Sequence, residues 1–314
     1  ENQSSSDWLK KEIQGLKDIE NLEVKTRTSV AAYHGYNYLL ARENLTDHLE
    51  KKYKQGKIRQ RLLKIRAKKV ILATGALERP LIFNNNDRPG IMLSSAVKKY
   101  ADFYGVICGQ KTVFFTNNDS AYESAFCLHN KGIKVEAIID IRDNSNSKIV
   151  KAVEDAGIKI HWSHTVVDTS GYKRLKNISI MKLSNDGMSV TGNRIEISCD
   201  CLGVSGGWTP AVHLFTQSGG KLSFDEENKV FLPSKYPSEQ ISIGSCNGDF
   251  KINQIIKNLS KNEQVKKIHA FSRTRHSYPS LKVTSHVINY RNEKEIADAA
   301  KLSSKAAKIN LVLV

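Results

Sequence analysis

The sequence has no long apolar run and no disulfide framework. No stretch approaches the roughly 18 consecutive apolar residues that cross a bilayer. The polar, serine-rich residues 1–7 lack the apolar centre of a signal peptide. The five cysteines are an odd number without the spacing of paired disulfides, which favours a reducing compartment. These absences predict a soluble, cytoplasmic protein without a membrane partner.

A metal site is not expected either. Cys199 and Cys201 form a C-x-C pair beside an apolar run. A structural zinc site needs four ligands, and no second pair of cysteines or histidines with suitable spacing lies near these two. The sequence therefore predicts no metal. The histidines His161, His164 and His213 have no partner nearby in the sequence that would orient the ring for catalysis, so no catalytic residue is expected in this chain.

Acidic residues are too few to balance the basic ones. Lys and Arg total 48 against 32 Asp and Glu, which gives a formal net charge of +16. Part of this excess lies in residues 250–314, which hold 13 basic and 4 acidic residues. Nucleic-acid-binding modules present aromatic platforms or groove-reading helices, and neither is evident here, so no nucleic-acid partner is expected. The helix-like residues 292–308 carry both charge signs and are expected to form a solvated amphipathic face.

The apolar pattern is that of an α/β protein. With 314 residues, 40% of them hydrophobic, the chain is long enough for two domains with ordinary cores. Its first part predicts a helix at 8–19, a strand at 22–26, a β-meander over 29–69 and a buried parallel strand at 69–73. A helix is expected at 94–105, with Ser94 or Ser95 as its N-cap.

A βαβαβ arrangement follows. Strands are expected at 111–116, 134–140 and 159–162, with helices at 120–131 and 147–156 between them, each closed by a glycine. Antiparallel strands at 176–183 and 194–198 and a buried strand at 201–204 complete this part. The economical reading is a nucleotide-binding domain of the Rossmann type with an added β-meander.

Glycine is missing where a dinucleotide-binding loop would need it. Residues 116–121 follow a strand and open a helix, but none of them is glycine. Side chains, including the Asp119 carboxylate, occupy the space that a pyrophosphate requires. The sequence therefore favours a helix N-terminus capped by Asn118 or Asp119 over an NAD(P)H site.

Two other glycine turns end apolar strands. The first holds Ala73, Thr74 and Gly75 and precedes the βαβαβ segment; the second, with Gly244, Asn247 and Gly248, follows it. This is the layout of flavoproteins in which a second dinucleotide-binding domain is inserted into the first, and both turns then serve the cofactor of the first domain. We expect these six residues to bind the cofactor.

The first domain of such proteins begins with G-x-G-x-x-G, which residues 1–72 do not contain. The expected fold is therefore a Rossmann-like FAD/NAD(P)-binding fold with an inserted second dinucleotide-binding domain and a first domain that is incomplete at its N-terminus. The expected domains are a partial first domain with the meander (1–104), an inserted domain with a degenerate glycine loop (105–205), a return to the first domain (206–260) and a basic C-terminal segment of uncertain structure (261–314).

Residues 68–97, 109–122 and 204–222 carry a specific resemblance. The T-N-N-D-S-A-Y that replaces the glycine loop and the S-G-G-W-x-P-A-V-H-L motif are similar to the alpha subunit of heterotetrameric sarcosine oxidase, over roughly residues 22–250. Weaker relatives are the alpha subunits of N-methylglutamate dehydrogenase, opine oxidase and dye-linked proline dehydrogenase. The chain departs from the family in lacking the N-terminal glycine fingerprint, and residues 251–314 do not resemble the family's folate domain.

The resemblance implies an oxidoreductase subunit that binds NAD in its first dinucleotide domain. It implies that a beta subunit binds FAD and oxidises the amine, that FMN lies at the alpha–beta interface, and that gamma and delta subunits complete the complex. That complex demethylates sarcosine to glycine with O2, forms hydrogen peroxide and passes the one-carbon unit to tetrahydrofolate or releases formaldehyde. The six residues of the two glycine turns match the family's NAD-contacting turns.

Several alternatives stay open at this point. The amine could be N-methylglutamate, an opine or proline, because the amine pocket belongs to another subunit. The chain could also be a non-catalytic assembly module with a dead nucleotide site. Arg79 could pair with a phosphate or with Asp87, and Trp208 could cover a cofactor ring or belong to the core.

Overall fold

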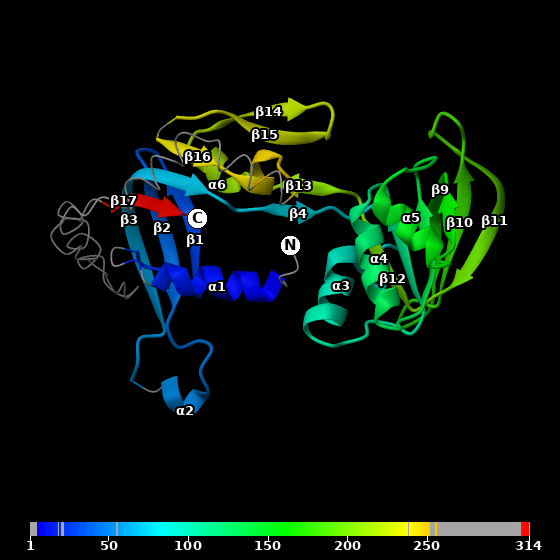
Figure 1. The fold of residues 1–314 in the computed structure, drawn as a ribbon, viewed down its shortest axis with the longest axis horizontal. Coiled ribbons are helices and arrows are strands. Elements are labelled where there is room, and N and C mark those ends of the chain that lie inside the picture. Colours follow the sequence, from blue (N-terminus) through cyan, green and yellow to red (C-terminus); the bar gives the residue numbers. More distant parts are fainter. Residues whose placement is uncertain are drawn as a thin grey trace. The chain divides into compact units, whose positions relative to one another are not determined.

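The computed structural model describes residues 5–17, 19, 22–54, 56–237, 239–251, 255 and 309–313. The chain forms two compact units (Figure 1). Unit 1 contains the residues up to Gly75 and those from Pro210 onward, and unit 2 is the intervening segment Ala76–Thr209. The chain thus leaves unit 1 once, builds unit 2 and returns.

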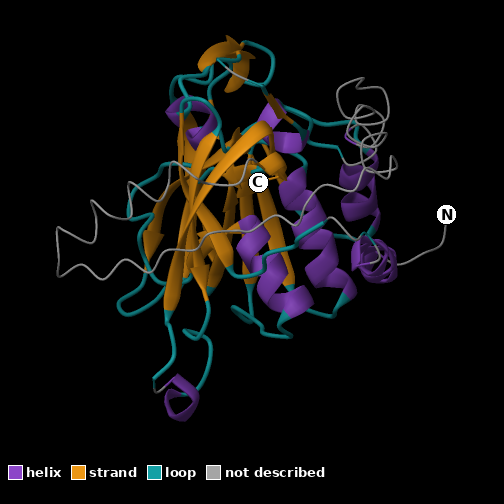
Figure 2. Ribbon diagram, turned by 90° about the vertical axis from the view of Figure 1, so that its left-hand side faces the viewer, coloured by secondary structure: helices purple, strands orange, loops and turns teal. Residues whose placement is uncertain are grey.

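The main sheet of unit 1 combines a meander with two parallel strands. Its members are β1 (Thr28–His34), β2 (Tyr38–Asn44), β3 (Gln60–Leu72), β16 (Gln240–Ser242) and β17 (Ile309–Leu313). The predicted meander is confirmed, since β1, β2 and β3, labelled in Figure 1, pair antiparallel; Figure 2 shows all strands in orange. The end of β3 pairs in parallel with both β16 and β17. The predicted parallel strand at 69–73 is therefore the last part of β3.

A buried asparagine, Asn37, fixes the turn between β1 and β2. Asn37 has a φ of 53°, in the left-handed region that asparagine tolerates better than most residues. Its side-chain nitrogen donates to the carbonyl oxygens of Lys68 and Glu239, both at 3.0 Å, and its side-chain oxygen accepts from the Tyr33 hydroxyl at 2.6 Å. The turn before β2 is therefore tied to β3 and to the residue before β16.

Some local expectations for unit 1 were wrong or incomplete. The predicted N-terminal helix forms as α1 (Ser5–Lys17), but Leu22 and Val24 lie in a loop, 43% and 64% exposed, rather than in a strand. A strand needs a partner, and no described strand pairs with these residues. A short helix, α2 (Lys51–Lys54), lies in the loop between β2 and β3 (Figure 1). Residues 292–308 lie outside the described residues.

Unit 2 is built on a parallel sheet. Its strands are, in spatial order, β5 (Ile91–Leu93), β12 (Cys201–Ser205), β6 (Thr112–Thr116), β7 (Val135–Asp140) and β8 (Ile160–Trp162). The predicted parallel pairing of the strands at 111–116 and 134–140 is confirmed by β6 and β7. All five residues of β6 and of β12 are buried, as expected for central strands covered on both faces.

Different layers cover the two faces of this sheet. The helices α3 (Ser94–Phe103), α4 (Ser120–Asn130) and α5 (Lys148–Asp155) share one apolar core with it, which includes Phe114 and Ile138. On the other face, the parallel sheet packs against a three-stranded antiparallel sheet of β9 (His164–Ser170), β10 (Asn177–Leu183) and β11 (Val190–Ser198). This second apolar core includes Val113 and Ile139. Successive side chains of one strand therefore point into opposite cores.

The caps of these helices were only partly predicted. Asp119, one of the two residues expected to cap α4, is its N-cap, although its side chain makes no capping hydrogen bond. Ser147 is the N-cap of α5, its hydroxyl accepting from the Val150 N–H at 3.4 Å. The prediction for α3 was wrong, because its N-cap is Leu93. The Glu78 carboxylate takes the capping position instead and accepts from the Ser95 N–H at 2.9 Å. A carboxylate from a distant segment therefore replaces the local cap that the sequence suggested.

The crossings between the units lie at the short paired strands β4 (Ala76–Glu78) and β13 (Trp208–Pro210). Unit 2 begins at Ala76, upstream of the expected boundary at 105, because β5 pairs with β12 and Val97 of α3 is buried in the unit 2 core. After β13 the chain forms α6 (His213–Gln217), the hairpin β14 (Lys221–Asp225) and β15 (Val230–Lys235), and the 3-10 helix η1 (Gly244–Asn247).

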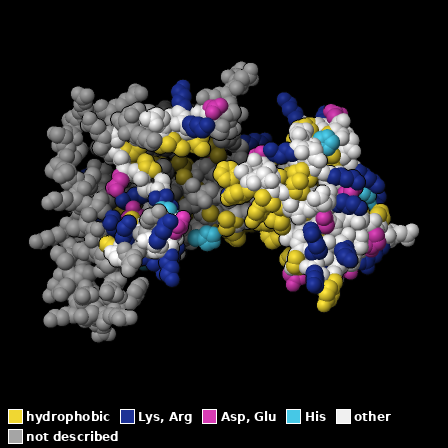
Figure 3. All heavy atoms as spheres, turned by 90° about the horizontal axis from the view of Figure 1, so that it is seen from below, with side chains coloured by type: hydrophobic (Ala, Val, Ile, Leu, Met, Phe, Trp, Pro, Cys, Tyr) yellow, Lys and Arg dark blue, Asp and Glu magenta, His cyan; other side chains and the backbone are white. Residues whose placement is uncertain are grey.

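The surface shows basic side chains scattered over the face seen in Figure 3 rather than gathered in one place.

Within the described ranges, no helix combines the length and apolar character needed to span a bilayer. Over the same residues, no three His, Cys, Asp or Glu side chains come together in a way that could hold a metal ion.

Candidate functional site

The two glycine turns lie at one edge of the unit 1 sheet. β3 and β16 are parallel neighbours, with Leu72 opposite Ser242 at their carboxyl ends. The first turn (Ala73, Thr74 and Gly75) follows β3, and the second turn (residues 243–248) follows β16. The carboxyl ends of parallel strands are where α/β sheets bind their ligands. Topology thus brings together two segments that are far apart in the sequence.

Hydrogen bonds tie the second turn to Leu72, the residue directly before the first turn. The Ile243 N–H donates to the Leu72 carbonyl at 2.9 Å, and the buried Cys246 thiol lies 3.3 Å from the same oxygen. A Cβ atom added to Gly75 would lie 3.9 Å from the Ser245 hydroxyl oxygen. The sequence did not single out Leu72, Ser245 or Cys246, whose contacts only the folded sheet reveals.

Both turns need glycine for their backbone conformation. Gly75, Gly244 and Gly248 have φ values of 76°, 73° and 87°, in the left-handed region where other residues are strained. Gly248 is also packed closely, because a Cβ there would lie 3.1 Å from side-chain carbons of Leu232. Among the described residues, only the Ser245 hydroxyl oxygen lies within 4 Å of a Cβ added at Gly75, so these residues leave room for a ligand beside that backbone.

Hydrogen bonds to Ala211 hold the first turn in place. The Thr74 hydroxyl donates to the Ala211 carbonyl at 2.7 Å, and the Ala211 N–H donates to the Gly75 carbonyl at 2.9 Å. Ala73 is exposed, while Asn247, the last residue of η1, is half-buried. All six predicted binding residues therefore lie in two adjacent turns of one unit.

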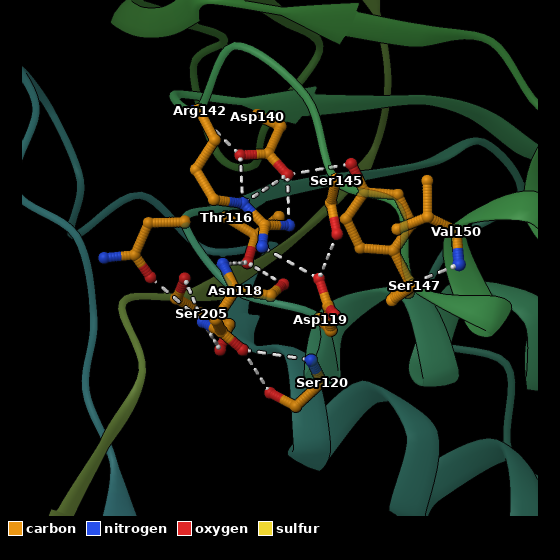
Figure 4. A network of polar contacts seen from close by, with 12 residues as sticks. Thr116, Asn118, Asp119, Ser120, Asp140, Arg142, Ser145, Ser147, Val150 and Ser205 are labelled. Atoms are coloured by element: carbon orange, nitrogen blue, oxygen red, sulfur yellow. Dashed lines mark hydrogen bonds and ion pairs between the residues drawn. The ribbon is translucent and has the colours of Figure 1, made fainter. Parts of the chain in front are cut away.

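The glycine-free turn of unit 2, residues 116–121, is filled by its own side chains (Figure 4). Asn118 is the centre of this network: its side-chain nitrogen donates to the Ser205 hydroxyl at 3.0 Å, and its side-chain oxygen accepts from the Ser120 N–H at 3.0 Å. The Asn118 N–H itself donates to the Thr116 hydroxyl at 3.0 Å. Backbone groups that would meet a pyrophosphate at a helix N-terminus are thus used within the protein.

The carboxylate at the end of β7 in unit 2 is also occupied by contacts within the protein. Asp140 ends β7, where a dinucleotide-binding domain places the carboxylate that binds a ribose, but its side chain is fully buried. The Arg142 guanidinium pairs with the Asp140 carboxylate at 2.7 Å and with the Asp119 carboxylate at 2.8 Å. The Tyr122 hydroxyl donates to the Asp140 carboxylate at 2.8 Å. Burial and the nearby Asp140 carboxylate raise the pKa of Tyr122 well above its usual range.

The same ion pairs hold the charge of Arg142. Burial opposes that charge, but the hydrogen bonds to Asp140 and Asp119 outweigh it and raise the pKa of Arg142 above its ordinary value. The spacing of an acidic strand end about 20 residues after the glycine loop could have drawn attention to Asp140. Nothing in the sequence showed that Arg142 would neutralise it.

We expect NAD affinity to be insensitive to this turn. Replacing Asn117 and Asn118 by glycine in the full-length protein should change the dissociation constant for NAD by no more than about threefold, or roughly 0.6 kcal/mol. The melting temperature should fall, because Asn118 loses its bonds to Ser205 and Ser120. Calorimetric titration and thermal unfolding measure the two effects, and a large change in NAD affinity would identify a working site here.

Of the three histidines, His161 has a feature that disfavours a role as general base. His161 and His164 pack edge to face with ring centroids 5.4 Å apart, and His213 begins α6. Burial, with the nearby charges of Lys159 and His164, lowers the pKa of His161 to about 4. An imidazole with that pKa is a weak base at neutral pH.

The lowered pKa of His161 also predicts a pH effect. Its ordinary pKa is about 6.5, so acid protonates the unfolded state before the folded one, and stability should fall as the pH drops from about 6.5 towards 4. Replacing His161 by glutamine should flatten the part of this slope that His161 causes, as followed by urea unfolding at several pH values. The same substitution at the exposed His48 is the control, and an unchanged slope in the His161 variant would contradict the prediction.

The remaining candidates of the sequence have structural contacts. Cys199 and Cys201 are buried, and burial raises the pKa of each thiol to about 12. The indole N–H of Trp208 donates to the Ser120 hydroxyl at 3.0 Å. The Arg79 backbone pairs with Gly206 and Gly207.

Comparison with solved structures shows the fold of FAD/NAD(P)-binding oxidoreductases. L-proline dehydrogenase from P. horikoshii superposes with a TM-score of 0.51 and 20% identity, over 85% of this chain and 48% of that chain. Bacillithiol disulfide reductase from Bacillus cereus gives a TM-score of 0.57 and 12% identity, over 85% and 77% of the two chains. At these identities the likeness concerns the fold. The predicted α/β fold class, a Rossmann-like FAD/NAD(P)-binding fold, is confirmed.

Comparison of sequences gives a narrower result, although no family model matches the chain. The sarcosine oxidase subunit alpha of Corynebacterium sp. (strain P-1) is 37% identical over 250 residues, covering 79% of this chain and 25% of that protein. The subunit alpha of Rhizobium meliloti (strain 1021) is 32% identical over 232 residues, covering 73% and 22%. The chain spans about a quarter of the length of the curated relatives it matches. The predicted resemblance is therefore confirmed: the chain is a relative of a segment of the sarcosine oxidase alpha subunit.

Proposed function

We propose that this chain supplies the NAD-binding part of an amine-oxidising flavoprotein complex of the sarcosine oxidase type. The observation that carries the proposal is that the first and second turns follow the paired carboxyl ends of the parallel strands β3 and β16, where the Ile243 N–H donates to the Leu72 carbonyl. Glycines with positive φ let the backbone approach a dinucleotide, and the open space around Gly75 fits such an approach. Sequence similarity to sarcosine oxidase alpha subunits supports an oxidoreductase role.

The residues of the site would bind and orient the cofactor rather than transfer protons. In this proposal the backbones of Gly75, Gly244 and Gly248 lie against the dinucleotide, while Thr74 and Cys246 keep the two turns in place through their bonds to Ala211 and Leu72. When bound, NAD supplies a ring that accepts or gives a hydride. No step of amine oxidation is assigned to this chain.

The chemistry of the whole complex is part of the same proposal. A beta subunit with FAD would oxidise sarcosine, FMN would lie at the alpha–beta interface, and gamma and delta subunits would complete a cytoplasmic complex. Sarcosine, O2 and water would give glycine, hydrogen peroxide and formaldehyde, or the one-carbon unit would pass to tetrahydrofolate. Support for this comes from the similarity to a segment of the relatives, which leaves N-methylglutamate, an opine or proline as other amines.

Unit 2 fits a second role within the complex, that of an assembly module with a dead nucleotide site. Asn118 occupies the helix N-terminus, and Arg142 and Tyr122 occupy the carboxylate that a ribose would need. This observation favours a domain that keeps the Rossmann-like architecture without a cofactor of its own. In this proposal the NAD site belongs to unit 1 alone.

Purification of the full-length protein with its partner subunits tests the proposal. Nucleotides released by heat are separated by chromatography, and peroxide formation is followed with each amine. We expect one NAD for each copy of this chain and the fastest turnover with sarcosine. Absence of NAD would refute the role of unit 1, whereas NAD with preference for another amine would correct only the substrate.

A further inference from the structure

A large apolar patch lies at the end of α3 in unit 2. Five large side chains within eight residues are exposed: Tyr100 (43%), Phe103 (76%), Tyr104 (57%), Val106 (48%) and Ile107 (53%). We refer to these five as the α3 patch. Figure 3 views the molecule from the side on which α3 lies in Figure 1 and shows apolar side chains gathered there. A folded protein seldom leaves so much apolar surface in one place without a binding role.

The α3 patch is not a misplaced part of the core. On its other side α3 buries Val97 and Ala101 in the apolar core of unit 2. The exposed rings pack on each other, with the Tyr104 ring 5.7 Å from that of Tyr100 and 4.9 Å from that of Phe103. The Val106 N–H donates to the Tyr100 carbonyl at 2.9 Å and holds the loop against the helix. The patch is thus a preformed surface.

Its size suits the centre of a protein interface. Five such side chains, about half exposed, present on the order of 500 Å² of surface, which is as large as the largest patch on a typical monomer. A stable interface buries about 800 Å² on each partner, with apolar residues at its centre and polar ones around it. Aromatic side chains are the residues that most often carry the binding energy of such interfaces.

The charges at its edge indicate what the partner carries. Lys131 pairs with Asp102 at 3.0 Å, and Lys98 lies 4.0 Å from Glu123. Lys99 is exposed, and no carboxylate of the described residues pairs with it. The charges of Lys131 and Lys98 are thus balanced by carboxylates, and Lys99 leaves one positive charge beside Tyr100. A partner that places a carboxylate there gains attraction and a faster association.

We propose that the α3 patch is a docking surface for another subunit of the oxidoreductase complex, one with an apolar centre and a carboxylate that can face Lys99. The inference rests on the proposed function, in which this chain works within such a complex. A second copy of the chain fits less well, because a twofold contact through this patch would bring Lys99 towards Lys99. Docking here would give unit 2 a role that needs no bound nucleotide.

The test uses the full-length protein expressed together with its partners. Phe103 and Tyr104 are both replaced by serine, Lys99→Glu is made separately, and Tyr172→Ser is the matched control, because Tyr172 is 89% exposed in the same unit but outside the patch. Native mass spectrometry measures the composition of the complex, and NAD content is measured on the same samples. Lys99→Glu changes one exposed side chain and keeps the test open if the double variant fails to fold.

We expect the double variant to lose a partner subunit, with affinity at least tenfold lower, and Lys99→Glu to weaken the same contact several-fold at low salt. NAD content should stay as in the wild type, which separates this inference from the NAD site. A complete complex with both variants would overturn the proposal. It would also fall if the double substitution abolished only self-association, or binding to anionic vesicles, and left the complex intact.

Discussion

Replacing Gly75 by valine in the full-length protein is expected to weaken NAD binding by at least about tenfold, or roughly 1.4 kcal/mol. Gly75 has a φ of 76°, where a β-branched side chain costs about 1–3 kcal/mol, so the turn will either strain or change shape. In either case its backbone no longer meets the dinucleotide in the same way. Calorimetric titration with NAD measures the loss, and the flavin content of the complex should stay unchanged.

The strain itself needs a control. Gly56 has a φ of 70° in the loop between α2 and β3, and no atom of the described residues lies within 4 Å of a Cβ added there, so Gly56→Val introduces a similar backbone strain away from the two turns. We expect this variant to bind NAD as the wild type does. Equal losses in the two variants would show that the effect comes from general destabilisation, and no loss at Gly75 would remove the first turn from the site.

The second large effect is expected in unit 2. Replacing Arg142 by methionine leaves the Asp140 carboxylate buried without its cation, and of the donors among the described residues only the Tyr122 hydroxyl and the backbone N–H of residue 142 remain. We expect the free energy of unfolding to fall by about 2–4 kcal/mol, since removing one partner of a buried ion pair is far more costly than removing the pair. Urea unfolding at neutral pH measures this change.

Arg194→Met is the matched control for that variant. Arg194 also pairs with two carboxylates, Asp168 at 3.0 Å and Glu196 at 3.1 Å, but its side chain is 48% exposed. Exposed pairs contribute little, so we expect a loss below about 1 kcal/mol. If the two variants lose the same amount of stability, the buried network around Asp140 is not the special feature that we infer.

Short-range patterns in the sequence were enough to predict the parallel strands and the helices between them. The apolar run before Gly75 and the glycine turn at residues 244–248 predicted strand ends, and the layout of the inserted segment predicted that they would be neighbours. Both predictions rest on general features of chain topology. The absence of glycine at 116–121 predicted a turn filled by side chains. The Asn118 side chain fills it through its hydrogen bonds to Ser205 and Ser120.

Contacts between distant segments could not be predicted in this way. The Cys246 thiol reaches Leu72, and Glu78 caps α3 in place of a serine, because the fold brings these residues together. β17, within a basic segment that gave no clear pattern, pairs with β3. The predicted strand at 22–26 failed for the opposite reason, since a local apolar pattern does not provide a pairing partner.

The most direct test of the proposed NAD site is an experimental structure of the full-length protein with NAD. We predict that the dinucleotide lies in unit 1 at the carboxyl ends of β3 and β16, with its phosphates or ribose against the backbone of Gly75 and of residues 244–248. The helix N-terminus at residues 116–121 of unit 2 should hold no nucleotide. A dinucleotide bound at that turn, or in unit 1 but away from both glycine turns, would contradict the account.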